Sequence, residues 1–354
     1  MKNQPILKFA LAASTCLGVA VASLPSGAAT RSMYFGCSAG GVLKNISVTA
    51  HACAKGTKVV SGKFAHANFA NANFSNATLT GANLSSATLS GVTSGHIIGK
   101  PASLPAHWQL VNGYLVGPGA DLTNATLKGA NLAKANLSNA IFFGANVTGT
   151  NFTSANLKGA TFFSANLTNA NFTGATLIAV SLSRATLAGT NFTGANFNGV
   201  ISAYVAGTPG TLPKNWQLVD GNFNGNVVAY LVGPGASIGG AQLKGSAFSN
   251  VNLNGIYMPG SNLVGTSFAG ATITNAVMSG SNFQNVDFSN ANMTGTNLSN
   301  SDFEGANLLN ANFTNVNLAN SRLLSVANVA TATFTGATCP DGVKFETLGS
   351  NCKY

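Results

Sequence analysis

The residues that could carry acid–base chemistry are few and scattered. Among 354 residues there are only seven carboxylates: Asp121, Asp220, Asp287, Asp302, Glu304, Asp341 and Glu346. A hydrolase needs an acid, a base or a nucleophile held against its substrate, but no histidine recurs at a fixed distance from any serine. Asp302 and Glu304 are close together, yet both fall at positions that the pattern described below turns towards solvent. The sequence therefore predicts that the protein is not an enzyme.

Two further patterns could indicate a bound phosphate or metal ion, and neither is complete. Residues 95–100 read G-H-I-I-G-K, one residue short of a phosphate-binding loop, and Pro101 follows where that loop needs Ser or Thr. The four histidines show no ligand spacing, and the glycine-rich Asp repeats that bind calcium are absent. No cofactor and no metal site are predicted.

Four cysteines lie beyond the first 29 residues: Cys37, Cys53, Cys339 and Cys352. An even number in an exported chain favours disulfides, and four cysteines allow three pairings. The two pairs sit at opposite ends of the repeat array described below, and a disulfide needs Cα atoms within roughly 7 Å. The expected pairs are therefore Cys37–Cys53 and Cys339–Cys352.

Residues 1–29 have the pattern of a secretory signal peptide. Lys2 and Lys8 precede an apolar run over residues 9–22, and small residues follow. A membrane anchor is disfavoured because a span needs about 20 apolar residues, and Ala-Ser-Thr before Cys16 makes a poor lipidation site. We expect the mature chain to be secreted, or held in the periplasm or cell envelope, without a membrane span.

Charge is scarce throughout the sequence. Charged residues make up 7%, whereas Asn (44), Gly (41) and hydrophobic residues (45%) are abundant. Helical enzymes need more Lys, Glu and Arg, collagen needs a three-residue glycine period, and a disordered chain would not carry 22 Phe. The formal net charge is +10, or +8 without residues 1–29.

A five-residue repeat fills most of the chain. From Ala120 it reads ADLTN ATLKG ANLAK ANLSN, and its central residue is Leu, Phe or Val in sixteen successive repeats over residues 122–197. Similar runs cover residues 64–89 and 238–323, and after a one-residue slip Val329 and Phe334 resume the pattern, for 42 repeats. This period fits neither a helix nor a strand. It predicts a coil that turns every five residues, with two side chains inside and three outside.

These repeats resemble the pentapeptide-repeat family, whose pattern is A-(N/D)-L-x-x. The resemblance covers about 60% of the chain and implies an all-β fold, a right-handed quadrilateral β-solenoid with four repeats per coil and about ten coils. The predicted domains are a disulfide-bonded N-terminal cap over residues 30–61, the solenoid over 62–338, and a disulfide-closed tail over 339–354.

A four-repeat coil predicts that residues 20 apart stack in columns. Leu132, Phe152, Phe172 and Phe192 then form an interior column. Outward columns beside it hold the polar residues Asn131, Asn151, Asn171, Asn191, Thr153, Thr173 and Thr193.

Two inserts interrupt the period, at residues 90–119 and 200–235. Both contain Leu-Pro-x-x-Trp-Gln-Leu-Val and hold the chain's two tryptophans, Trp108 and Trp216. Asn112-Gly113 is a strong hairpin signal, so each insert is predicted to be a β-hairpin that leaves one coil and returns into the next. Each Trp could bind a ligand such as a sugar, but the shared frame favours packing of the hairpin on the solenoid.

Phe143 and Phe163 occupy outward positions one coil apart, where Thr or Ser is normal. Two stacked, exposed Phe rings need a cover. An insert folding back over them is the simplest one, and a binding partner is the alternative.

We expect a non-catalytic, exported scaffold that presents flat polar faces to an unknown protein or envelope polysaccharide. The alternative is a binder of polysaccharide, or of ice, through the Asn and Thr columns, although outward positions must be polar in any case. Some members of the resembled family mimic DNA and inhibit gyrase. The positive charge and export signal make that the least favoured function, and scattered basic residues argue against nucleic acid.

Overall fold

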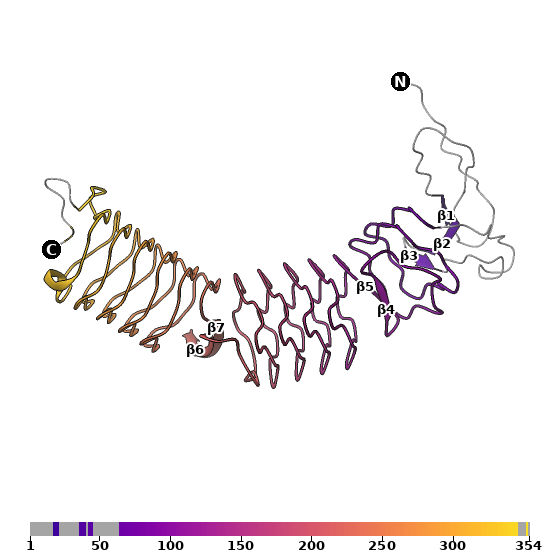
Figure 1. The fold of residues 1–354 in the computed structure, drawn as a ribbon, viewed down its shortest axis with the longest axis horizontal. Coiled ribbons are helices and arrows are strands. Elements are labelled where there is room, and N and C mark those ends of the chain that lie inside the picture. The colour runs from indigo at the N-terminus through magenta and orange to yellow at the C-terminus, as the bar shows by residue number, and fades with distance from the viewer. Residues whose placement is uncertain (1–16, 21–34, 40–41, 45–63, 346–351, 353–354) are drawn as a thin grey trace, which may run out of the picture. The chain divides into compact units, whose positions relative to one another are not determined.

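The computed structural model describes residues 17–20, 35–39, 42–44, 64–345 and 352. The chain divides into two compact units, Met1–Leu115 (unit 1) and Val116–Tyr354 (unit 2). In each unit the repeats wind into coils that stack on one another, as Figure 1 shows. This arrangement lets each coil cover the apolar residues of the next, which a single coil could not do.

Each repeat makes one side of a four-sided coil, because a left-handed residue turns the chain every five residues. In the repeat that ends at Gly159, that glycine has φ 71°, and the amide of Ala160 closes the turn on the carbonyl of Leu157 at 2.9 Å. Most turning positions hold Gly or Asn, the residues that tolerate this conformation best. The abundance of both residues in the sequence follows from this geometry.

Successive coils pair through parallel bridges between residues 20 apart. Asn131, Asn151, Asn171 and Asn191 form one continuous series of such bridges. The amide of Leu132 donates to the carbonyl of Asn151 at 2.7 Å. The predicted 20-residue coil is therefore confirmed.

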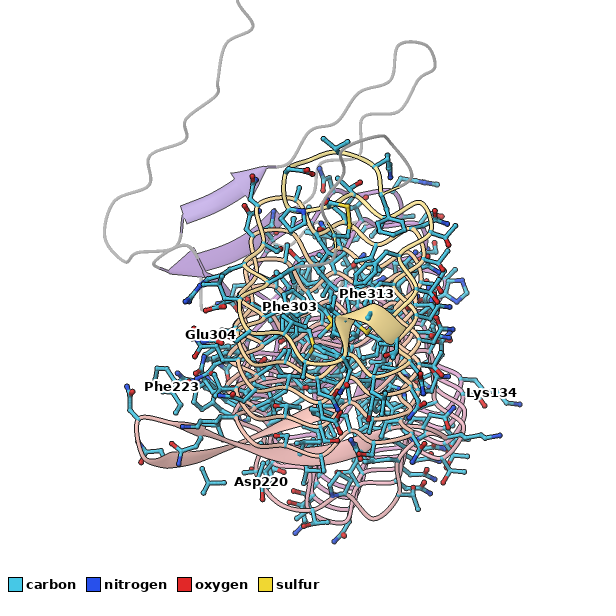
Figure 2. All side chains as sticks on the ribbon, turned by 90° about the vertical axis from the view of Figure 1, so that its left-hand side faces the viewer. Lys134, Asp220, Phe223, Phe303, Glu304 and Phe313 are labelled. Carbon is cyan, nitrogen blue, oxygen red and sulfur yellow. A yellow bond between two sulfur atoms is a disulfide. The ribbon has the colours of Figure 1, made fainter. Side chains whose placement is uncertain are left out.

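The interior holds columns of stacked apolar side chains. Phe152 and Phe172 stack with centroids 4.7 Å apart at 10°, and Phe172 and Phe192 stack at 5.2 Å and 21°. Leu132 lies buried at the start of this column, as predicted. Farther along unit 2, Figure 2 shows Phe303 and Phe313 inside the coils.

Polar side chains also enter the interior, and the buried Thr and Ser residues have hydrogen-bond partners, whereas Nε2 of Gln217 in β6 (Gln217–Phe223) is buried without one. Thr150 is fully buried, and its hydroxyl donates to the carbonyl of Leu127 at 2.7 Å. A column of buried serines runs through four coils of unit 2, where each hydroxyl accepts the amide of the residue one coil earlier: Ser261, Ser281, Ser301 and Ser321. The alanine position of the repeat can thus hold a hydroxyl, because the backbone supplies a hydrogen-bond partner.

Both inserts contain the expected hairpins, but these are shorter than the breaks in the sequence pattern. Strands β4 (Gln109–Val111) and β5 (Tyr114–Val116) pair in the first, and β6 (Gln217–Phe223) and β7 (Asn226–Val232) pair antiparallel in the second. Both hairpins turn at Asn-Gly, with positive φ at each residue, as a two-residue type I′ turn requires.

The coils continue through much of both inserts. Thr78 bridges Ile98 and Asn191 bridges Thr211 in the usual parallel manner. The sequence period fails over residues 90–103 and 201–211 while the backbone still stacks, because the bridges use backbone atoms that any residue supplies.

The two ends of the array differ from its middle. Strands β1 (Leu17–Ala20), β2 (Phe35–Ala39) and β3 (Val42–Lys44) form an antiparallel sheet, with β1 inside the predicted signal peptide. Cys53 and the predicted Cys37–Cys53 bond lie outside the described residues. At the other end, the one-residue slip is taken up by a short 3₁₀ helix, η1 (Val329–Thr331), after which bridges join residues 21 apart.

Cys339 and Cys352 are buried and paired, with Cα atoms 4.9 Å apart, which is the geometry a disulfide needs. The two cysteines are 13 positions apart in the sequence, so replacing Cys352 with Ser should destabilise the C-terminal tail locally by about 3 kcal/mol. Exposure of the last coil edge should then promote aggregation. Hydrogen exchange read by mass spectrometry checks this.

The expected result is faster exchange over residues 334–345, with residues 120–200 unchanged as the internal control. Loss of protection across both segments at once would contradict local closure of the end.

Among the described residues, none forms a helix with the length and hydropathy to cross a bilayer.

Candidate functional site

Most carboxylates of unit 2 make the hydrogen bond to the backbone that an Asn side chain usually makes in the repeat. In ordinary repeats the Asn side chain accepts the amide two residues later, as Asn171 does from Thr173 at 3.0 Å. Four acidic residues accept the equivalent amide in the same way: Asp121, Asp287, Asp302 and Asp341. The Oδ1 atom of each of these four carboxylates thus accepts a backbone amide, as the Asn side chain does elsewhere in the array.

Asp302 and Glu304 do not form a free carboxylate pair. Arg322 bonds both, at 3.3 Å to Asp302 and 2.9 Å to Glu304. Asp287 lies on a different side of the coil from Asp302, because the two belong to different series of bridges. Within the described part of the chain, no three His, Cys, Asp or Glu residues gather where they could hold a metal ion.

The predicted polar column uses its hydrogen bonds largely within itself. The hydroxyl of Thr153 donates to the side chain of Asn151, and that of Thr173 to Asn171, both at 2.6 Å. Asn151 also donates to Asn131 at 3.2 Å. At the end of the column, Thr193 donates to Thr211 and Thr211 to Asn191. The threonine hydroxyls of the column and the side-chain amide of Asn151 therefore bond within the column, on its solvated surface.

The opposite side of unit 2 carries a run of aromatic rings with one cation. Phe143 and Phe163 stack in parallel, with centroids 5.5 Å apart at 5°. The guanidinium of Arg184 lies 5.6 Å from the centroid of Phe163 and 5.8 Å from that of Tyr204. Tyr204 then meets Phe223 of β6 edge to face at 6.4 Å. We call these five residues the aromatic ladder.

The expectation that an insert covers Phe143 and Phe163 is wrong. Phe143 remains 46% exposed, and the side chain over Phe163 is Arg184, from the next coil. The hairpin β6–β7 reaches the ladder only at Tyr204, through Phe223. The hairpin is attached to the adjacent side of the coil instead, where its backbone forms a hydrogen bond with the backbone of Gln242.

Tyr230 of β7 anchors that hairpin. Its hydroxyl accepts the amide of Gln242 at 3.3 Å. Burial raises the pKa of the Tyr230 phenol above its ordinary value, while the hydrogen bond from Gln242 opposes this shift and the nearby Tyr204 adds to it. The hairpin therefore joins the end of the ladder to a buried contact.

The polar column and the ladder lie on opposite sides of the coil. Asn131 and Ile141 are ten residues apart, which is two of the four sides, and each continues its own series of bridges. Figure 2 shows Lys134, which follows the polar column, and Phe223 of the ladder projecting on opposite sides. The candidate residues named from sequence thus belong to two separate surfaces.

Trp108 and Trp216 occupy equivalent turns in the two inserts. Each donates its amide to the carbonyl of the proline three residues earlier at 3.1 Å. Trp216 meets Phe197 edge to face at 4.9 Å, and Gly233 lies so close that a Cβ there would enter the indole ring. Trp108 packs half-buried against the core of unit 1. These contacts favour packing, although an open cleft of about 540 Å³ adjoins Trp216.

Three family profiles match this chain. Pentapeptide repeat region matches residues 120–192, pentapeptide repeats (8 copies) match 63–93 and 281–320, and pentapeptide repeats (9 copies) match 235–300. Together they cover more than half of the chain. It is a pentapeptide-repeat protein.

The stacked four-sided coils form the right-handed quadrilateral β-helix of this family. HetL, involved in heterocyst differentiation regulation in the cyanobacterium Nostoc, is 22% identical over 80% of this chain and 93% of its own, with a TM-score of 0.26. The plasmid-mediated fluoroquinolone resistance protein QnrB1 is 23% identical over 53% of this chain and 82% of its own, with a TM-score of 0.27. No curated protein matched the chain.

Sequence reasoning found the start of the ladder but not its continuation. Arg184 and Tyr204 were missed because each stands one position later in its repeat than Phe143 and Phe163 do. They occupy the turning position, where Gly or Asn is usual, and both have positive φ, 60° and 57°. A large side chain at that position was the signal that could have revealed them.

Proposed function

We propose that this pentapeptide-repeat protein is a non-catalytic scaffold that is exported and binds another macromolecule through the outer sides of its coils. The observation that carries the proposal is that several carboxylates form hydrogen bonds with the backbone of the repeats. Asp121 and Asp287 serve the backbone in place of Asn, and Asp302 is also neutralised by Arg322. This structural use of three of the seven acids supports binding rather than catalysis.

The signal-like residues 1–29 and the cysteines support export to an oxidising compartment. The partner would then be a protein or a polysaccharide outside the cytoplasm. Gyrase inhibition remains the least supported role, because it calls for an acidic surface and this chain has a formal net charge of +10.

Site-specific photocrosslinking in the native envelope tests the proposal. A photoreactive residue is placed either at Thr173, in the polar column, or at Phe143, in the ladder. We expect one discrete crosslinked product from one of the two sides. Absence of product from both sides would contradict a binding scaffold.

A glycan array and an ice-recrystallisation assay test the alternative use of the polar column. The protein with Thr173→Lys is the matched control, since it disrupts the column without touching the interior. Equal behaviour of the two proteins would show that the column is only a solvated surface.

A further inference from the structure

We propose that the aromatic ladder is a docking surface for an acidic protein partner, with Arg184 as its central anchor. The inference rests on the proposed binding function and adds the surface and the chemistry of the partner.

Several apolar side chains of the ladder and its neighbours are exposed to solvent. Tyr204 and Phe223 are each 42% exposed, and Ile141 and Ile201 on the same side of the coil are exposed as well. Thr161 and Ser181 lie between them in the same series of bridges and supply polar neighbours. Aromatic residues and Arg in an apolar centre with a polar rim are the composition of protein–protein hot spots.

At Phe163 the stacking geometry leaves no ring face free for a base or a sugar. A base or a sugar ring stacks on a free aromatic face. Phe143 and Arg184 stand one coil before and one coil after Phe163, so both faces of that ring are taken. What Phe163 offers to solvent is its ring edge, which buries well against aliphatic or aromatic side chains of another protein.

The charge of Arg184 indicates what the partner must carry. Among residues 64–345, ion pairs are formed only by Arg322 with Asp302 and Glu304, so Arg184 has no carboxylate there. Two rings hold its guanidinium in place, and an ordered guanidinium binds a carboxylate in two-pronged fashion. A partner with an acidic group amid apolar side chains complements this surface.

Other segments of this protein complement the ladder poorly. Residues 30–63 contain five Lys or Arg and no acid. A second copy carries the same excess of positive charge, and like charges oppose association. Charge complementarity therefore favours a different, acidic protein.

The backbone at Arg184 and Tyr204 would accommodate Asn better than the side chains that stand there. Arg184 and Tyr204 both adopt the left-handed conformation, which is unfavourable for residues other than Gly and Asn. Replacing Arg184 with Asn should therefore leave thermal stability unchanged or raise it while weakening binding.

Peptide binding to the purified full-length chain tests the proposal. The probes are fluorescent 12-residue peptides that alternate Leu or Phe with Asp or Glu, and matched peptides with Asn or Gln in place of the acids. Fluorescence anisotropy should show at least about tenfold tighter binding of the acidic set, and Arg184→Asn should remove that preference. Phe163→Ser should weaken binding of both sets.

Lys134→Asn is the matched control, because Lys134 is also a cation in a left-handed position (φ 59°) but on the opposite side. Leu309→Ser is the control for an exposed apolar residue away from the ladder. Both controls should bind like wild type.

The proposal is overturned if no acidic peptide binds, if the amide peptides bind equally well, or if Lys134→Asn has the effect of Arg184→Asn. A dimer in sedimentation that Arg184→Asn dissociates would assign the ladder to a second copy instead. If the peptides do not bind but Thr173 gives a crosslinked product, the scaffold function still stands and only the binding role of the ladder is rejected.

Discussion

Phe172→Ala should lower the free energy of unfolding of unit 2 by about 3–5 kcal/mol. The Phe172 ring is fully buried and stacks on Phe152 and Phe192 in the neighbouring coils, and it meets Phe162 edge to face at 5.7 Å. Its loss leaves a cavity that these neighbours cannot fill, because bridges on both sides fix the spacing of the coils.

Denaturant unfolding followed by tryptophan fluorescence measures the effect. The chain has two Trp, one in each unit, so a Trp108→Phe background leaves Trp216 as the reporter for unit 2. Trp216 contacts Phe197, which lies edge to face with Phe192. It is therefore joined to Phe172 through an unbroken chain of rings.

Phe143→Ala is the matched control, because Phe143 belongs to the exposed ladder. It should cost less than about 1 kcal/mol, the range of an aromatic pair outside a core. If Phe172→Ala were as mild as Phe143→Ala, the interior columns could not be the main source of stability.

The sequence predicts the coil well because a five-residue period leaves few choices. Two residues in each repeat of five must be buried, and four repeats make one coil, so residues 20 apart stack in columns. Phe152 and Phe172 lie where this period places them. The hairpins follow as well, since Asn112-Gly113 dictates the turn. The backbone bridges, by contrast, ignore side-chain identity, so the sequence could not show that the coils continue to Ser103 and Thr211.

The surface is harder to predict than the interior. Its composition is nearly uniform, so a functional patch appears only where side chains from several coils meet. The ladder combines two positions of the repeat with one residue of a hairpin. No spacing in the sequence links Arg184 with Phe223, and their relation depends on where β6 folds. The serine column was missed for another reason, because a hydroxyl in place of Ala appears unfavourable until its backbone partner is known.

Trp216→Ala tests whether the hairpin tryptophans serve packing or ligand binding. If packing is their role, the substitution should destabilise unit 2 by about 2–4 kcal/mol, somewhat below the cost for a fully buried Trp because the ring is only partly buried. Trp216→Phe should recover most of the loss, since a smaller ring can still meet Phe197. Circular dichroism during denaturant unfolding measures both variants.

Combining Trp216→Ala with a substitution at Gly233 tests the packing role of Trp216 more directly. A Cβ at residue 233 would enter the indole ring, so Gly233→Ala must displace Trp216 and should destabilise unit 2 by about 1–3 kcal/mol. In the double variant the ring is gone and the added methyl group has room. The two losses should therefore not add, and the coupling energy should exceed about 1 kcal/mol. If the two changes were additive, or if Trp216→Ala left stability intact, the indole would not be a packing element, and the cleft beside it would become the place to look for a ligand.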